Sequence, residues 1–383
     1  MSLPPSTPEN LPGTTPEVNP SNPALRLSKT AKKGWVVAAL ALPLIAGALF
    51  IFKPGAGPQA LADPPHAAPI ALSASDLRAA LPAQTQEGQP TELRLHLQLS
   101  HPAGPIQLKL SYADTSYTGE AKQVSQNLEW GGEALTVPLI FESPGKKTIE
   151  IKNSQNGLLT TLPIDVKPFP ATVFPKDWEQ YKDMEMGNPQ RFKIWANLFY
   201  DEKIAPKQRQ YVQITYDDRI VDRFLVSSGA PGHATPTGKY KLGFKDYYPR
   251  SARYNNTPMP FWSAINVNGV QGEYGFHSLE DGGYLYLLGR PASHGCIRLS
   301  RLPSVETDPK TGAKFWGDRG GARWIYDRVP PETPVTIFKS KLSSFEFQDY
   351  EGYLIAQAKA AQAELATKKK QVQAPVQENK QNG

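Results

Sequence analysis

Strict alternation of apolar and polar residues marks the part of the chain that begins near residue 90. Leucines alternate with polar or charged residues over 93–99. The same period of two recurs at 106–110, 135–139, 149–151 and 162–166. This period is typical of strands with one buried and one solvated face. About six or seven short strands of this kind predict an antiparallel β-sandwich of immunoglobulin-like type over 76–167. Asn156-Gly157 predicts a type I′ hairpin turn between its last two strands. We interpret this domain as a spacer or docking module.

A second β-rich region follows. Segments 210–216 and 219–226 predict two strands joined by a turn at Asp217-Asp218. Further short apolar runs lie at 240–242, 259–267, 275–277, 284–288, 324–326 and 334–338. We interpret them as parts of a mainly β domain with little helix. This second domain is expected over 210–339. The aromatic-rich segment 168–209 is assigned to a connection between the two domains.

The amino-terminal end has a different character. Residues 34–52 carry no charge and would span roughly 28 Å as a helix, which is close to the thickness of the bilayer core. Lys and Arg crowd the preceding flank, so the positive-inside rule places residues 1–33 in the cytoplasm as a disordered tail. The sequence predicts a single-pass cytoplasmic membrane protein whose linker, 53–75, and later domains are periplasmic or otherwise extracytoplasmic. The alternative is a signal peptide cleaved after Ala62, and amino-terminal sequencing of the mature protein separates the two.

The carboxyl-terminal end predicts an amphipathic helix within 340–370 and a disordered tail at 371–383. Leu354, Ala358, Ala361 and Leu365 lie on one helical stripe. A basic run follows at 368–370, and the chain has a net charge of +6. We interpret that run as a solvated tail, and no nucleic-acid partner is expected.

The chain contains a single cysteine, Cys296. Exported proteins usually pair their cysteines, so a solitary one outside the membrane favours a reactive thiol over a structural bridge. His294 lies two residues before it, and His277 ends a predicted strand upstream. Gly295 permits a sharp turn that would bring main-chain N–H groups close to a reacting carbonyl. This pattern favours a cysteine nucleophile over a small buried side chain.

These residues also resemble a known signature. His277, a fifteen-residue gap and then Ser293-His294-Gly295-Cys296-Ile297-Arg298 are similar to the motif of the L,D-transpeptidase (YkuD-type) family. The blocks 226–229 with 235–238, 288–291 and 333–335 resemble the parts of that family that flank the motif. The resemblance covers 210–339 and implies a mixed β-sheet catalytic domain.

The resemblance implies a reaction and a partner. Cys296 would attack the carbonyl between the third and fourth residues of a peptidoglycan stem tetrapeptide and form a thioester. His277 would act as general base, and His294, Gly295 and Cys296 would present the oxyanion donors. An acceptor amine would then make a 3-3 cross-link or attach an envelope protein, in cell-wall biogenesis and the maintenance of cell shape. No cofactor and no metal are implied.

Three more residues are assigned to the substrate side of the site. Ser278 would orient the base through its main-chain carbonyl, and Ser293 would shape the loop with its hydroxyl. Arg298 would meet a substrate carboxylate or brace the loop, and a structural salt bridge is the alternative. The polar insertion 303–321 could cap or narrow the donor groove.

Two other functions stay open. The same scaffold could be an L,D-carboxypeptidase or amide hydrolase in which water replaces the acceptor. It could also be a non-catalytic cell-wall or zinc-binding module, because His277, His294 and Cys296 are three possible zinc ligands. Papain-like proteolysis is disfavoured because both histidines precede the cysteine.

Overall fold

The computed structural model describes residues 72–98, 105–131, 134–175, 187–204, 209–279, 282–307 and 311–341, with scattered helical positions between 356 and 367. The predicted cytoplasmic tail, the predicted transmembrane helix 34–52, most of the linker and the tail 371–383 lie outside these residues. Within them, no helix has both the length and the apolar character needed to cross a membrane. The helix expected in 340–370 is described only at the scattered positions, which are helical.

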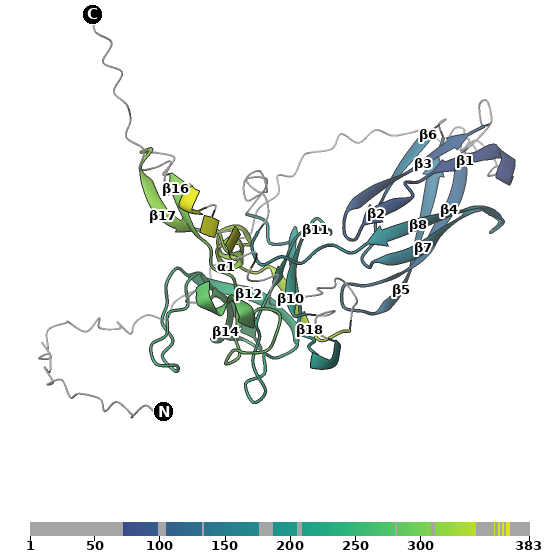
Figure 1. Cartoon of the computed structure of the whole chain (residues 1–383). Coiled ribbons are helices and arrows are strands. Elements are labelled where there is room, and N and C mark those ends of the chain that lie inside the picture. Colours follow the sequence, from purple (N-terminus) through teal and green to yellow (C-terminus); the bar gives the residue numbers. More distant parts are fainter. Residues whose placement is uncertain are drawn as a thin grey trace, which may run out of the picture. The chain divides into compact units, whose positions relative to one another are not determined.

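The first domain consists of two β-sheets (Figure 1). Its strands are β1 (Leu77–Ala80), β2 (Gln84–Gln86), β3 (Pro90–Leu97), β4 (Ile106–Thr115), β5 (Ala121–Trp130), β6 (Ala134–Ile140), β7 (Gly145–Asn153) and β8 (Leu158–Lys167), preceded by the 3-10 helix η1 (Ala74–Asp76). One sheet has the order β1-β3-β6 and the other β2-β8-β7-β4-β5. The predicted strands are therefore present, and assignment to the immunoglobulin-like class stays a prediction.

The alternation of the sequence explains how these sheets pack. In β3 every second residue is buried, and its Leu93 and Leu95 join Ile106 and Leu110 of the other sheet in one apolar cluster. Burial of each such side chain contributes roughly 1.5–3 kcal/mol. Leu72 also belongs to this cluster, so the domain begins a few residues before the predicted boundary at 76.

The predicted turn at Asn156-Gly157 is wrong in type. Strand β7 ends at Asn153 and β8 begins at Leu158, so four residues form the loop. The side-chain oxygen of Asn153 accepts hydrogen bonds from the amides of Gln155 and Gly157, at 3.1 and 2.8 Å. This side chain closes the wider loop in place of a two-residue type I′ turn, which requires positive φ at both central positions. Only Asn156 has a positive φ, of 64°.

The second domain is built on one mixed sheet with the order β11-β10-β9-β18-β12-β13-β14-β15. These strands are β9 (Phe192–Asn197), β10 (Tyr211–Tyr216), β11 (Arg219–Leu225), β12 (Gly238–Asp246), β13 (Trp262–Val267), β14 (Val270–Ser278), β15 (Ile297–Leu299) and β18 (Pro334–Phe338). The pairs β9/β18 and β14/β15 are parallel, and the other neighbours are antiparallel. A separate hairpin pairs β16 (Pro303–Thr307) with β17 (Lys314–Asp318), and short 3-10 turns occur at η3 (Glu202–Ile204) and η4 (Gly282–Leu287).

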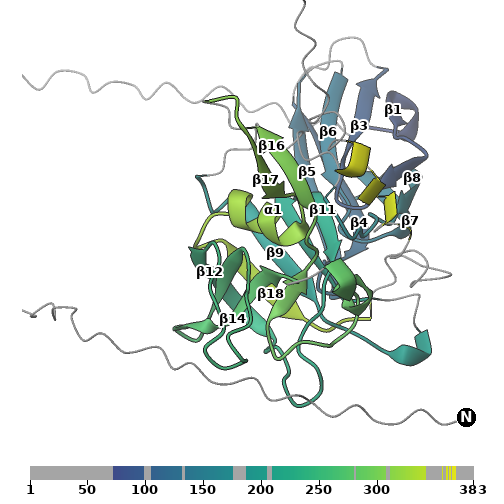
Figure 2. The ribbon, with the colours of Figure 1, turned by 60° about the vertical axis from the view of Figure 1, so that its left-hand side comes forward.

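The expected strand at 324–326 is wrong, because these residues lie in helix α1 (Gly321–Arg328). Gly321, Trp324, Ile325 and Arg328 are buried, which is the three-to-four spacing of a helical face. Three consecutive apolar residues are too few to distinguish this period from that of a strand. The helix packs against β13, β14 and β15, beside the sheet in Figure 2. It therefore supports the strands that carry the predicted base and nucleophile.

The predicted boundary at 210 is also too late. Strand β9, assigned from sequence to the connecting segment, lies between β10 and β18 in the centre of the sheet. Its side chains Phe192, Ile194 and Ala196 are fully buried in the core of the catalytic domain. The abundance of aromatics in 168–209 concealed this strand, because buried central strands need not alternate with polar residues.

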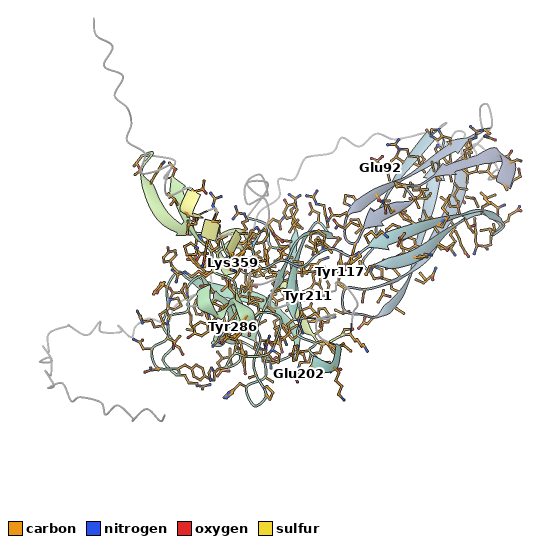
Figure 3. The ribbon with its side chains drawn as sticks, in the orientation of Figure 1. Glu92, Tyr117, Glu202, Tyr211, Tyr286 and Lys359 are labelled. Carbon is orange, nitrogen blue, oxygen red and sulfur yellow. The ribbon has the colours of Figure 1, made fainter. Side chains whose placement is uncertain are left out.

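A buried ion pair connects the sandwich to β11. The Arg223 guanidinium donates to both carboxylate oxygens of Glu87, at 2.7 and 3.2 Å, and to the main-chain oxygen of Phe169 at 2.6 Å. Side-chain exposure is 0% for Arg223 and 5% for Glu87. Tyr117 of the sandwich, labelled in Figure 3, donates to the main-chain oxygen of Asp218 at 3.2 Å. The strand that receives these contacts continues directly into the segment that holds the nucleophile loop.

Arg223→Met should lower the free energy of unfolding by about 3–5 kcal/mol, because it leaves the Glu87 carboxylate buried without its cation. The matched control is Arg94→Met, whose pair with Glu92 is exposed and should contribute no more than about 1 kcal/mol. Urea denaturation of both variants measures the difference. Equal losses in the free energy of unfolding would show that the buried pair stabilises the fold no more than the exposed pair.

Candidate active site

The site is positioned by the parallel pairing of β14 with β15. His277 is the register partner of Arg298, and Phe276 is the partner of Ile297. Cys296 immediately precedes β15, and its sulfur lies beside β14, 3.9 Å from the main-chain oxygen of Glu273. The predicted base and the predicted nucleophile, nineteen positions apart in the sequence, thus lie on neighbouring strands. The predicted strand ending near the histidine is confirmed, with β14 extending one residue further to Ser278.

The orientation of the His277 imidazole is fixed by its neighbours. Nδ1 lies 2.8 Å from the main-chain oxygen of Ser278. Because a carbonyl oxygen only accepts, Nδ1 carries the proton and Nε2 is left as the proton acceptor. The indole of Trp262 stacks on the ring, with 5.9 Å between centroids. The hydrogen bond from Nδ1 agrees with the predicted role of the Ser278 carbonyl. Ser278 itself is fully buried and is not among the residues that line the cavity described below.

A glycine makes that stacking possible. A Cβ atom at Gly275 would come within 2.7 Å of the Trp262 ring. Any other residue at 275 would therefore displace the tryptophan from the imidazole. Gly275 also makes a backbone hydrogen bond to the Cys296 thiol, which lowers the pKa of that thiol.

Ser293 holds the nucleophile loop together from inside. Its hydroxyl donates to the main-chain oxygen of Cys296 at 2.6 Å and accepts the amide of Gly295 at 3.1 Å. Ser293 is 1% exposed, so its hydroxyl acts on the loop, in agreement with the loop-shaping role expected from the sequence. The Gly295 amide is consequently occupied. The amides of His294 and Cys296 have no acceptor within the described part of the chain, so they are the better oxyanion donors.

Two further segments fasten the same loop. Ser227 exchanges two main-chain hydrogen bonds with Arg298, each 2.9 Å long. The hydroxyl of Thr235 donates to the main-chain oxygen of Gly295 at 2.6 Å and accepts the amide of Gly229 at 3.0 Å. Gly295 has a φ of +120°, which L side chains rarely adopt. The flanking blocks 226–229 and 235–238, which resembled the family from sequence, therefore hold the nucleophile loop.

Burial sets the protonation states of the two reacting groups. Desolvation, with a smaller effect of Arg298, lowers the pKa of His277 to about 4. Desolvation raises the pKa of Cys296 to about 11, against the opposing effects of the Gly275 hydrogen bond and of Arg298. At neutral pH the site therefore holds a thiol and a neutral imidazole.

Among the described residues, Arg298 has no carboxylate partner. It forms no ion pair with any described residue, and its guanidinium makes only a long hydrogen bond, 3.4 Å, to the main-chain oxygen of Ala292. Desolvation lowers its pKa, and the Cys296 thiolate would raise it. The salt-bridge alternative has no partner among the described residues, and the nearby Cys296 is the group whose negative charge this cation favours.

A cavity of about 400 Å³ opens beside Cys296. Its walls come from β12, from the loop 247–261, from β13 and β14 and from His294; among them are Phe244, Tyr254, Trp262 and Tyr274. The His294 ring is exposed and lies against the Tyr254 and His233 rings, with centroids 4.5 and 5.0 Å away. None of the described residues of 303–321 lines this cavity, so the wall expected from that insertion is provided by loop 247–261.

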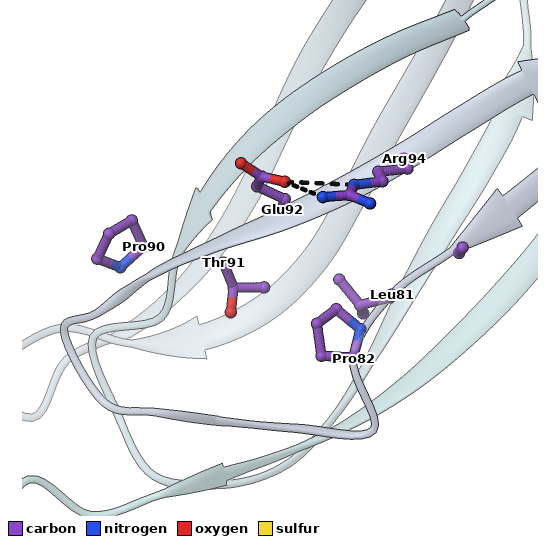
Figure 4. Close-up of a pocket in the computed structure, with 7 residues that line it drawn as sticks. Leu81, Pro82, Pro90, Thr91, Glu92 and Arg94 are labelled. Carbon is purple, nitrogen blue, oxygen red and sulfur yellow. Dashed lines mark hydrogen bonds and ion pairs between the residues drawn. The ribbon is translucent and has the colours of Figure 1, made fainter.

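A second cavity, of about 520 Å³, lies on the sandwich between the ends of β1 and β3 (Figure 4). Leu81, Pro82 and Thr91 form part of its wall, and the ion pair between Glu92 and Arg94 borders it. It contains no nucleophile and no histidine, so the cavity beside Cys296 is the candidate active site.

The zinc-binding alternative lacks its ligand set. Across the part of the chain that the structure describes, no three His, Cys, Asp or Glu side chains gather closely enough to hold a metal ion. His277, His294 and Cys296 all belong to that part. The three candidates therefore do not converge on one point.

Comparisons with known proteins agree with this geometry. Residues 199–337 match the family model described as the L,D-transpeptidase catalytic domain, YkuD. Residues 199–337 form a YkuD-type L,D-transpeptidase catalytic domain. The family model begins eleven residues before the boundary that we expected from the sequence.

Solved structures similar to this chain are distant. An L,D-transpeptidase from Stackebrandtia nassauensis is 18% identical over 42% of this chain and 60% of its own, with a TM-score of 0.28. An L,D-transpeptidase from Mycobacterium smegmatis is 14% identical over 68% and 96%, with a TM-score of 0.26. The catalytic domain of the Enterococcus faecium L,D-transpeptidase is 20% identical over 38% and 95%, with a TM-score of 0.24. No curated protein sequence matches the chain.

Several residues of the YkuD domain that shape the site were not singled out from the sequence. Trp262 and Gly275 support the base, and Tyr254 joins loop 247–261 to the nucleophile loop. The available signal was the glycine directly before the buried Phe276-His277 step, because a glycine inside a strand often marks a close approach of another group.

Alkylation of Cys296 by iodoacetamide should be slow at pH 7 and rise about tenfold per pH unit up to pH 9.5, because only the thiolate reacts. A pKa near 11 leaves roughly one thiol in 10,000 ionised at pH 7. Cys296 is the only cysteine, so intact mass reports this group alone, and Cys296→Ser is the blank. A rate that is already constant below pH 8 would contradict a raised pKa.

Thr235→Val should reduce kcat of the YkuD domain about tenfold or more, because the loop loses the hydroxyl that joins Gly295 to Gly229. Thr237→Val is the matched control, since Thr237 is exposed and only its main-chain oxygen is used, by Tyr240. Initial rates of the activity proposed below, release of the terminal residue from a stem tetrapeptide, measure both variants. Similar rates in both variants would show that the Thr235 hydroxyl does not support the nucleophile loop.

Proposed function

We propose that this protein is a cysteine-dependent L,D-transpeptidase that acts on peptidoglycan stem tetrapeptides. The observation that carries the proposal is the pairing of β14 with β15. It places the sole thiol of the chain, directly before β15, on the strand beside β14, which carries an imidazole whose Nδ1 is committed to the Ser278 carbonyl. The match of 199–337 to the family model supports the reaction class.

The first half of the reaction follows from the protonation states. The Nε2 atom of neutral His277 takes the thiol proton as Sγ of Cys296 bonds to the carbonyl carbon between the third and fourth residues. The amides of His294 and Cys296 donate to the oxygen that becomes negative, an effect worth ~10²–10³ in rate per donor. The imidazolium then returns the proton to the leaving amine, the C–N bond breaks, and the terminal D-residue departs from a thioester.

The second half transfers the acyl group. An acceptor amine attacks the thioester while His277 Nε2 removes its proton, and the thiolate leaves and is reprotonated by the same imidazole. A stem-peptide amine gives a 3-3 cross-link, and an amine of an envelope protein gives an attached protein. Water as acceptor gives the hydrolase alternative.

We propose that the domain works outside the cytoplasmic membrane on an anchor formed by residues 34–52. The uncharged run and its basic amino-terminal flank support this location, because peptidoglycan stems are joined on that side of the membrane. The anchor lies outside the described residues.

Incubation with purified tetrapeptide muropeptides should release the terminal D-residue and produce cross-linked dimers, read by mass. Cys296→Ala should abolish both products, because no other thiol is present in the chain. Tripeptides without dimers would favour the hydrolase. Release that survives Cys296→Ala would overturn the mechanism, and no release by the unmodified protein would overturn the function.

A further inference from the structure

A single buried glutamine connects the centre of the catalytic sheet to the segments around the nucleophile loop. Gln210 directly precedes β10 and is 2% exposed. Its side-chain nitrogen donates to the main-chain oxygen of Leu198, directly after β9, at 2.8 Å. Its side-chain oxygen accepts the amide of Ser228 at 3.0 Å. The two ends of this side chain therefore hold a central strand and the segment after β11 at a fixed separation.

The main chain of Gln210 makes two more connections of this kind. Its amide donates to the main-chain oxygen of Gly289 at 3.0 Å, and its oxygen accepts the amide of Val226 at 3.1 Å. The Gly289 amide also donates directly to the main-chain oxygen of Val226, at 2.7 Å. All the polar groups of Gln210 are thus occupied, and most of them bind the blocks 226–229 and 288–291 that flank the catalytic motif.

From Ser228 the connection continues to the reacting residue. The main-chain oxygen of Ser228 accepts two amides, that of Ala292 at 2.9 Å and that of Ser293 at 2.8 Å. The Ser293 hydroxyl in turn donates to the main-chain oxygen of Cys296 at 2.6 Å. Only Ser228 and Ser293 therefore stand between Gln210 and the main chain of Cys296 in this series of hydrogen bonds.

We propose that Gln210 is a positioning residue for the proposed L,D-transpeptidase reaction. Acting through Ser228 and Ser293, it holds the thiol and the amide of Cys296 where the reaction needs them. Gln210 does not line the cavity beside Cys296, so it acts without touching a substrate. The consequence for catalysis rests on the proposed function, whereas the support of the loop does not.

Gln213 offers a matched comparison. It lies within β10 and is 1% exposed, so the same substitution places the same apolar side chain in the interior at both positions. Its side-chain oxygen accepts Nε of Arg223 at 3.0 Å, at the junction with the sandwich. Its side chain makes no hydrogen bond to the blocks 226–229 and 288–291, which the structure describes in full. A substitution at Gln213 therefore disturbs the interior of the same sheet without releasing the nucleophile loop.

Amide hydrogen exchange, read by mass spectrometry on the full-length protein, compares Gln210→Met with Gln213→Met. Gln210→Met should raise the exchange rate of the peptide covering 288–299 about tenfold or more, because the Ser228 amide loses its buried acceptor. Gln213→Met should leave the exchange of this peptide unchanged. Equal exchange of this peptide in the two variants would overturn the inference, and because no substrate is used, that outcome does not depend on the proposed function.

A measurement on the unmodified protein keeps the inference testable if Gln210→Met does not fold. The Ser228 amide, assigned by nuclear magnetic resonance, should exchange about a hundredfold or more slowly than an unprotected amide, because the Gln210 side chain holds it. Exchange of this amide at the rate of an exposed loop would overturn the inference.

Kinetics with a stem tetrapeptide test the consequence for the reaction. Gln210→Met should lower kcat about tenfold or more and leave KM within about twofold, because the reacting groups are displaced while the substrate contacts remain. Gln213→Met should retain the kcat of the unmodified protein. Equal kcat in the two variants would overturn the positioning role. No turnover by the unmodified protein would instead overturn the proposed function.

Discussion

The parallel pairing of β14 with β15 is the constraint on which the rest of the site depends. It sets His277 opposite Arg298, two residues after the thiol, and a shift of one residue would move the imidazole to the opposite face of the sheet. The other interactions protect this register. Helix α1 covers the strands, Ser227 pairs with Arg298, and Ser293 and Thr235 hold the loop that precedes β15.

Burial of His277 and Cys296 has opposite consequences for their proposed roles. The imidazole of His277 and the thiol of Cys296 are both neutral because the fold removes them from water. A neutral imidazole can accept a proton, whereas a neutral thiol is a weak nucleophile. The guanidinium of Arg298 has the opposing effect, since it favours negative charge on the sulfur. In the proposed reaction, proton transfer is therefore coupled to formation of the carbon–sulfur bond in the bound substrate.

The sequence predicted what depends on local pattern. Period-two alternation located β3, β4, β6, β7 and β8 of the sandwich, short apolar runs located most strands of the catalytic sheet, and the motif located Cys296, His277 and the loop between Ser293 and Arg298. Helix α1 was missed because its apolar residues span less than two turns, and β9 because a central strand need not alternate. The stacking of Trp262 over Gly275, the walls of the cavity and the junction at Arg223 arise from long-range contacts, which no local pattern encodes.

The central claim is that Cys296, with its proton taken by His277, carries the acyl group of the donor. Intact mass spectrometry of the protein during reaction with a stem tetrapeptide tests this most directly. The account predicts a mass increase equal to the stem without its terminal residue, located by digestion to the peptide containing Cys296 and absent in His277→Ala. An adduct on another residue, or product formation without any covalent adduct in a rapid quench, would contradict it.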